Sequence, residues 1–63
     1  MRINIFGSEF QNRGLDMNDP NFSEVYVNYI QDHYFNGADL AIIYIGYAWL
    51  EDNIIFEFDM IPN

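Results

Sequence analysis

The stretch Leu40–Ile61, LAIIYIGYAWLEDNIIFEFDMI, decides the fold. Its first half is rich in β-branched and aromatic residues, as strands are. Its second half has a period of two, and one side of it is entirely large and apolar: Ile54, Phe56, Phe58 and Met60. Glu51 and Asp52 lie between the two halves as a two-residue turn. The stretch therefore predicts a β-hairpin.

The turn also fixes the register of this hairpin, because a two-residue turn pairs Leu50 with Asn53. In that register, eight large apolar side chains share one face, with four from each strand: Trp49, Tyr47, Ile45 and Ile43 opposite Ile54, Phe56, Phe58 and Met60. We expect these eight to form the core side of the sheet. The alternate positions then face away from the core.

Upstream, Arg2–Phe6 alternates as a short strand that ends at Gly7-Ser8. The polar segment from Ser8 to Asn21 predicts a loop that apolar residues pin to the core, with Phe10, Leu15 and Met17 as candidates. A loop of this length in a small domain is unusual, and such loops are often functional.

A helix is expected from about Pro20 to Phe35. Asp19 precedes the proline as N-cap, and Asn36-Gly37 supplies a left-handed stop. The residues of one face recur at helical spacing: Phe22, Val25, Tyr26, Tyr29, Ile30, His33 and Tyr34. This face should pack against the sheet.

These elements predict an α+β fold in a single domain over residues 1–63. The order is β-α-β-β, with one helix on one face of a three-stranded sheet. The first strand is expected antiparallel beside the last, which gives the strand order 1-3-2. The chain has no cysteine, so its twelve aromatic residues (six Phe, five Tyr, one Trp) must provide the buried area of so small a domain.

The charge is strongly one-sided: ten acidic residues stand against two arginines, for a formal net charge of −8. Such a body is repelled by phosphates, so direct nucleic-acid binding is disfavoured. Hydrophobic residues make up 51% of the chain, which argues against an acidic disordered tail. A compact protein with this field is suited to a positively charged partner.

The sheet face away from the helix is the first candidate for such a contact. It should carry Tyr44, Gly46, Ala48, Ile55, Glu57, Asp59 and Phe6. Glu57 and Asp59 would project about 7 Å apart, roughly the spacing of phosphates along a nucleic-acid strand. Gly46, opposite Glu57, would leave room for an arginine of the partner. The alternative is that both carboxylates only solvate an outer face.

A second acidic surface is expected along the helix and its entry, from Asp16, Asp19, Glu24 and Asp32. Glu24 lies in the first helical turn, where its charge favours the helix dipole; this structural role is enough to explain it, so Glu24 is not a candidate partner-binding residue. The turn acids Glu51 and Asp52 complete the candidate partner-binding residues.

Catalytic chemistry is not indicated. The only histidine, His33, lies on or beside the core-facing stripe, where packing is the commoner role, and lysine and cysteine are absent. Asp16-Met17-Asn18-Asp19 lacks the glycine and late glutamate of a calcium loop. We expect no enzyme activity, cofactor or metal. The N-terminus has no signal-peptide pattern, and Leu40–Leu50 is too short to span a membrane, so a cytoplasmic protein is expected.

In size, acidity and aromatic content the whole chain resembles phage-encoded DNA mimics, including anti-CRISPR proteins that block Cas9. The resemblance is one of type and has no motif. It implies an inhibitor that occupies the basic nucleic-acid-binding surface of a Cas9-type nuclease or its guide complex, in the cytoplasm of a bacterial host. Two alternatives stay open: a homo-oligomeric module, such as a homodimer stacked through the outer sheet face, and an antitoxin-like partner of a basic protein.

Overall fold

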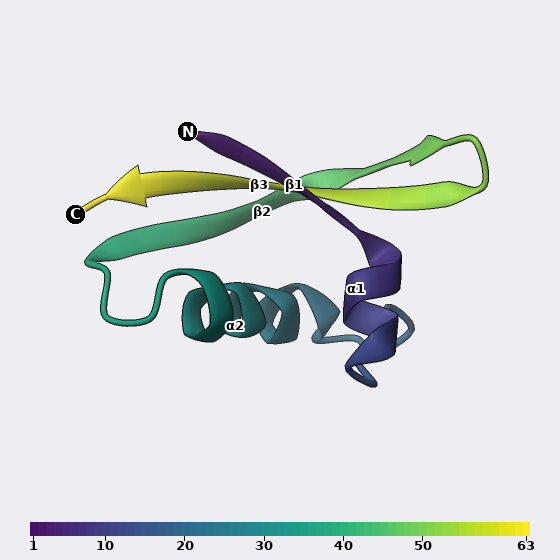
Figure 1. Ribbon diagram of the computed structural model, residues 1–63, viewed down its shortest axis with the longest axis horizontal. Helices are drawn as coiled ribbons and strands as arrows, with labels where there is room; N and C mark the ends of the chain where they lie inside the picture. Colours follow the sequence, from purple (N-terminus) through teal and green to yellow (C-terminus); the bar gives the residue numbers. More distant parts are fainter.

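The computed structural model describes residues 1–63 as a three-stranded sheet with helices on one side only (Figure 1). In chain order the elements are β1 (Arg2–Phe6), α1 (Gly7–Asn12), α2 (Phe22–Tyr34), β2 (Leu40–Leu50) and β3 (Asn53–Pro62). β3 lies in the centre, antiparallel to both neighbours, in the order β1-β3-β2. The expected α+β class and strand order are confirmed.

The register of the β2–β3 hairpin follows the prediction from the turn inward. Leu50 pairs with Asn53, and Gly46 pairs with Glu57 as expected. The turn itself holds Glu51 in the left-handed region, at φ 56°. Positive φ at the first turn position is the requirement of a II′ hairpin turn, which glycine usually meets.

A β-bulge at Ile45 then shifts the register by one residue, so that Tyr44 rather than Ile45 lies opposite Phe58. The expected core positions of Ile45 and Ile43 are therefore wrong. Both lie on the outer face, 45% and 46% exposed. The bulge is tolerated because β2 has large, mainly apolar side chains at odd and even positions alike, so the shift exchanges Ile43 and Ile45 for Ile42 and Tyr44 on the helix side.

The core lies between β3 and the helices. All four β3 residues expected there are buried: Ile54, Phe56, Phe58 and Met60. Phe10, Tyr26 and Ile30 meet them from the helices, each no more than 1% exposed. The Phe10 and Tyr26 rings stack in parallel, with centroids 3.8 Å apart, and Tyr26 meets Phe56 edge-on. This aromatic packing buries the apolar area that stabilises a small domain without disulfides.

The segment expected as a loop from Ser8 to Asn21 instead begins with α1. Phe10 was expected to anchor this segment to the core, and it does so from α1. The helix ends at Asn12, shortly before Gly14, whose φ is 76°. At Gly7 the backbone approaches β3 so closely that an added Cβ would meet Ile54 Cγ2 at 2.3 Å. Glycine is therefore required where α1 begins.

The predicted helix is α2, shorter by two residues at its start and one at its end. Its N-cap is Asn21 rather than Asp19, and no side chain caps it. Asp19 instead accepts the backbone N–H of Asn21 in the preceding turn, at 2.9 Å. The expected left-handed stop is confirmed at Gly37, with φ 85°.

The sheet-facing stripe of α2 is narrower than the spacing predicts. Tyr26 and Ile30 are buried, but His33 and Tyr34 are exposed. The His33 ring stacks on Tyr29 with centroids 4.2 Å apart, and so it packs at the surface rather than in the core.

The end of the β2–β3 hairpin, at its turn, extends beyond the helices (Figure 1). Tyr47 and Trp49 lie on the helix side of the sheet as expected, because they pair with Phe56 and Ile54. They are nevertheless 57% and 63% exposed. Their expected burial is wrong because the helix layer is shorter than the strands.

Candidate functional site

The candidate interaction surface is the outer face of the sheet, on the side without helices (Figure 1). β3 alternates between its two faces, so Glu57 and Asp59 project from the outer one while Phe56 and Phe58 are buried on the other. The two acids lie at the centre of the sheet, because β3 has a neighbour on each side. The structure thus brings this predicted pair together.

The two carboxylates differ in their surroundings. Asp59 pairs with Arg2 on β1 and with Ile43 on β2. Its Oδ1 lies 3.5 Å from Nε of Arg2, the one ion pair of the protein. An exposed pair of this kind stabilises a fold by about 0–1 kcal/mol, but it halves the free charge on this face.

Glu57 has neither an ion-pair partner nor a side-chain hydrogen bond. It lies between Asn4 of β1 and Gly46 of β2. An added Cβ at Gly46 would meet nothing within 4 Å, so the space beside Glu57 is open, as expected. Glu57 is therefore the residue of this face best placed to receive a cation.

Tyr44 does not belong to this surface. Because of the bulge it faces the helices, where its ring meets Phe22 edge-on at 5.4 Å and lies 5.7 Å from Phe58. Burial raises the pKa of its hydroxyl above the ordinary value. The expected placement of Tyr44 on the outer face is wrong.

Apolar side chains surround the acids. Ile43 and Ile45 occupy the outer face of β2, and Phe6 lies opposite Ile55 on β1; Ile43, Ile45 and Phe6 are each about half exposed. Leu50 and Ile61 extend the surface towards its two ends. Exposed apolar residues gathered on one face are typical of contact surfaces.

The loop acids Asp16 and Asp19 have a local structural role. The Oδ1 of each accepts the backbone N–H two residues further on, at 2.9 Å in both cases. These are Asx turns, which shape the entry into α2. Both residues are exposed to solvent.

The remaining predicted acids do not join the outer face. Asp32 is exposed on α2 without a hydrogen bond, and Glu51 and Asp52 form the exposed tip of the hairpin. Asp52 lines a hollow of about 210 Å³ with Trp49 and Met17, between the outer hairpin and the helix layer. The predicted partner-binding residues thus occupy separate regions and form no single acidic patch.

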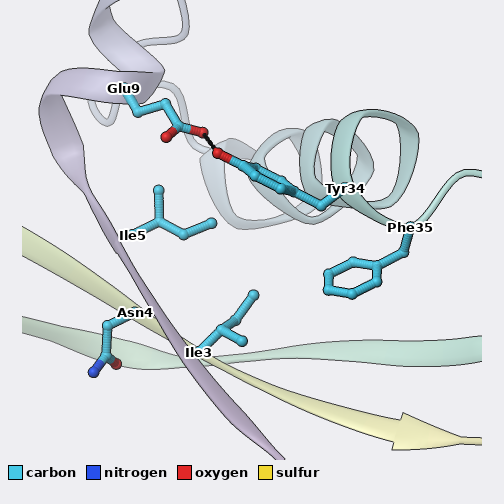
Figure 2. A pocket seen from close by; sticks show the side chains of 6 residues that line it. All are labelled: Ile3, Asn4, Ile5, Glu9, Tyr34 and Phe35. Atoms are coloured by element: carbon cyan, nitrogen blue, oxygen red, sulfur yellow. Dashed lines mark hydrogen bonds between the residues drawn. The ribbon is translucent and has the colours of Figure 1, made fainter.

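One carboxylate was missed by the sequence analysis. Glu9 lies on α1, half-buried beside a hollow of about 230 Å³ (Figure 2). Its Oε2 accepts hydroxyl hydrogen bonds from Tyr34 and, at 3.2 Å, from Tyr29. Glu9 precedes the buried Phe10 and the left-handed Gly14. That glycine was the available signal for a helix end.

No group of three or more His, Cys, Asp or Glu residues is arranged to hold a metal ion. No helix combines the length and apolar character needed to cross a membrane. In comparisons with known proteins, no family model, no curated protein and no solved structure matches the chain.

Proposed function

We propose that the protein is an acidic inhibitor that binds the basic, nucleic-acid-binding surface of a nuclease. The observation that supports this is the lack of internal neutralisation. Of the ten acidic side chains only Asp59 has a cation within 4.0 Å, and the other nine have none. A charge of −8 that the fold does not neutralise is available to steer a cationic partner towards the protein.

The outer sheet face is the proposed contact surface. Glu57 offers an unpaired carboxylate beside the open space at Gly46, and Ile43 and Ile45 offer apolar area. Because the acids are spread over several regions and Asp59 is paired with Arg2, a continuous row of phosphate-like charges is absent. Inhibition would therefore combine general attraction with one central carboxylate and an apolar contact.

Within this class the preferred target is a Cas9-type effector in the cytoplasm of a bacterium. Such an enzyme holds its guide–target duplex in a positively charged channel and reads the PAM through arginines. The resemblance in size and composition to anti-CRISPR proteins favours this target. A uracil-DNA glycosylase, a restriction enzyme or a basic toxin would present similar cations.

The test is DNA cleavage by a purified, guide-loaded Cas9-type nuclease with increasing amounts of the protein. We expect inhibition that weakens as salt rises, because the Debye length falls to about 8 Å at physiological ionic strength. Glu57→Lys should abolish it. Glu24→Lys is the matched control, since it makes the same charge change on the exposed side of α2.

The outcomes separate the steps of this proposal. Equal loss with both variants would mean that only net charge matters and would reject the outer face as the contact. No inhibition of the nuclease, the glycosylase or a restriction enzyme, with no complex at low salt, would reject the inhibitor function itself.

A second candidate function is a homodimer through the outer sheet face. The exposed Ile43, Ile45 and Phe6 favour it. Stacking two copies would bury Glu57 of each protein on a face whose one cation, Arg2, already pairs with Asp59, at a considerable desolvation cost. Light scattering after size-exclusion chromatography distinguishes the two: a tight dimer that Ile43→Asp dissociates would replace the inhibitor proposal.

A further inference from the structure

A hollow of about 230 Å³ opens between β1, α1 and the end of α2. Figure 2 shows Glu9 and Tyr34 on one side of it, Ile3 and Ile5 on the β1 side, and Phe35 at one end. A water molecule occupies about 30 Å³ of liquid, so the hollow holds several waters or one long side chain. It is smaller than most pockets for drug-sized ligands.

The polar group of this hollow is a carboxylate with unused capacity. Both tyrosine hydroxyls donate to Oε2 of Glu9, whereas Oε1 accepts no hydrogen bond within the protein. Neither arginine of the chain forms an ion pair with Glu9, and the nearby Arg13 guanidinium lies over the Tyr29 ring, 6.0 Å from its centre. A half-buried, oriented carboxylate without an ion pair favours a cation as its ligand.

The walls favour a particular cation. Ile3 and Ile5 present aliphatic surface, and Tyr34 and Phe35 present aromatic rings. An aliphatic stem packs on the former, and a planar guanidinium stacks on the latter while donating to Oε1 of Glu9. An ammonium group is more strongly hydrated and lacks the planar fork.

We infer that this hollow is a receptor for an arginine side chain of a partner protein. The inference goes beyond the outer sheet face, and it rests on the proposed function only in taking the arginine from a basic protein. It gives the inhibitor a second point of attachment that is selective for a side-chain type rather than for charge alone. Arginines that hold phosphates in a nucleic-acid-binding protein have the required chemistry.

The test uses Nα-acetyl-arginine methylamide as the probe, with the citrulline analogue as a neutral isostere and the lysine analogue as a second cation. NMR titration of the whole protein should shift the methyl signals of Ile3 and Ile5 with the arginine probe, and saturate at millimolar concentration as expected for so small a ligand. The citrulline probe should produce no shift, and the lysine probe should bind several-fold more weakly.

Glu9→Gln keeps an oxygen for the tyrosine hydroxyls but removes the charge, and it should eliminate these shifts. Glu24→Gln removes the same charge from the exposed side of α2 and should leave them unchanged. Equal shifts with arginine and citrulline, full binding by Glu9→Gln, or no shift in the wild-type protein would each overturn the inference. The comparison of the probes on the wild-type protein needs no variant to fold.

The failure of this inference differs from the failure of the proposed function. Probe binding without inhibition of any nuclease would leave the arginine receptor and reject the inhibitor. Undiminished inhibition by Glu9→Gln, with no probe binding, would reject the receptor and leave the inhibitor.

Discussion

The two faces of β3 are made by the same ten residues and have opposite properties. Towards the helices, Phe56 and Phe58 are 1% and 0% exposed in an aromatic core. Towards solvent, Glu57 and Asp59 alternate with them on a face that no helix covers (Figure 1). The comparison shows that the residues buried in the core and the acidic residues of the proposed contact surface are interleaved along the chain yet separated in space. Changes on the outer face should therefore leave the fold intact.

The strongest test of this separation removes one large side chain from each face. Phe58→Ala deletes a fully buried ring and should cost about 3–5 kcal/mol, enough to unfold a domain with so small a core. Ile43→Ala trims a side chain that is 46% exposed and should cost under about 1 kcal/mol. Urea unfolding followed by circular dichroism measures both. Similar losses for the two variants would show that the outer face is part of the core.

Gly7, at the start of α1, and Gly46, in β2, give a second matched pair. Gly7→Ala places a methyl group 2.3 Å from Ile54 Cγ2 and 3.2 Å from Phe56 Cε2. Relieving this overlap must move α1 away from β3, at a cost of about 1–3 kcal/mol. Gly46→Ala meets no atom within 4 Å and should be neutral or slightly stabilising. Thermal unfolding of the two variants measures the difference, and a destabilised Gly46→Ala would mean that the bulge depends on glycine.

The sequence was sufficient for the parts of the fold where the pattern admits one solution. The period of two in β3 and the turn after Leu50 determined the central strand, the strand order and the pairing of Gly46 with Glu57. The pattern fails beyond Gly46 because β2 is apolar on both faces there. Apolar side chains therefore face the core in either register. The observed shift of one residue moves Tyr44 from the outer face to the helix side of the sheet.

The candidate site was predictable only in part, for the same kind of reason. Glu57 and its open neighbour Gly46 follow from the register. Glu9 was missed because α1 has six residues and too few apolar positions to show a helical period, so that Gly14 was the one indication of a helix end. To predict the ion pair between Asp59 and Arg2, the strand order must be combined with the register between β1 and β3. That register places Arg2 directly opposite Asp59.

A smaller effect is expected from salt, since the acids of the outer face and of the loops repel one another. Moderate NaCl should raise the melting temperature by a few degrees, as it screens charges more than about 10 Å apart at 0.1 M. Glu57→Gln should raise it at low salt and reduce the salt response. Asp59→Asn loses the Arg2 pair as well as a charge, and should gain less. A melting temperature that falls with salt would mean that the acids are stabilised by cations within the fold.

The smallest effect on stability is expected from the hydrogen bond that Tyr34 of α2 donates to the carboxylate of Glu9 on α1. The hydrogen bond to Glu9, with a lesser contribution from burial and from the Glu9 charge, raises the pKa of Tyr34 from 10.0 to about 12. The native state therefore holds this proton more tightly than the unfolded chain. The resulting stability is fully present below pH 10 and is lost as the pH rises towards 12. Because Tyr34 is 53% exposed, solvent screening keeps the loss small.

Tyr34→Phe isolates this contribution from those of Tyr26 and Tyr44, whose pKa values are also raised, in both cases mainly by burial. Urea unfolding of the wild-type protein and the variant over this pH range should show two curves that converge as the pH approaches 12. The absorbance of tyrosinate should show one fewer late-titrating group in the variant. Curves that stay parallel would mean that Tyr34 stabilises the fold through its ring alone. Glu9 would then be held by Tyr29 only, and its carboxylate would be less firmly oriented towards the hollow than the hydrogen bonds of Figure 2 indicate.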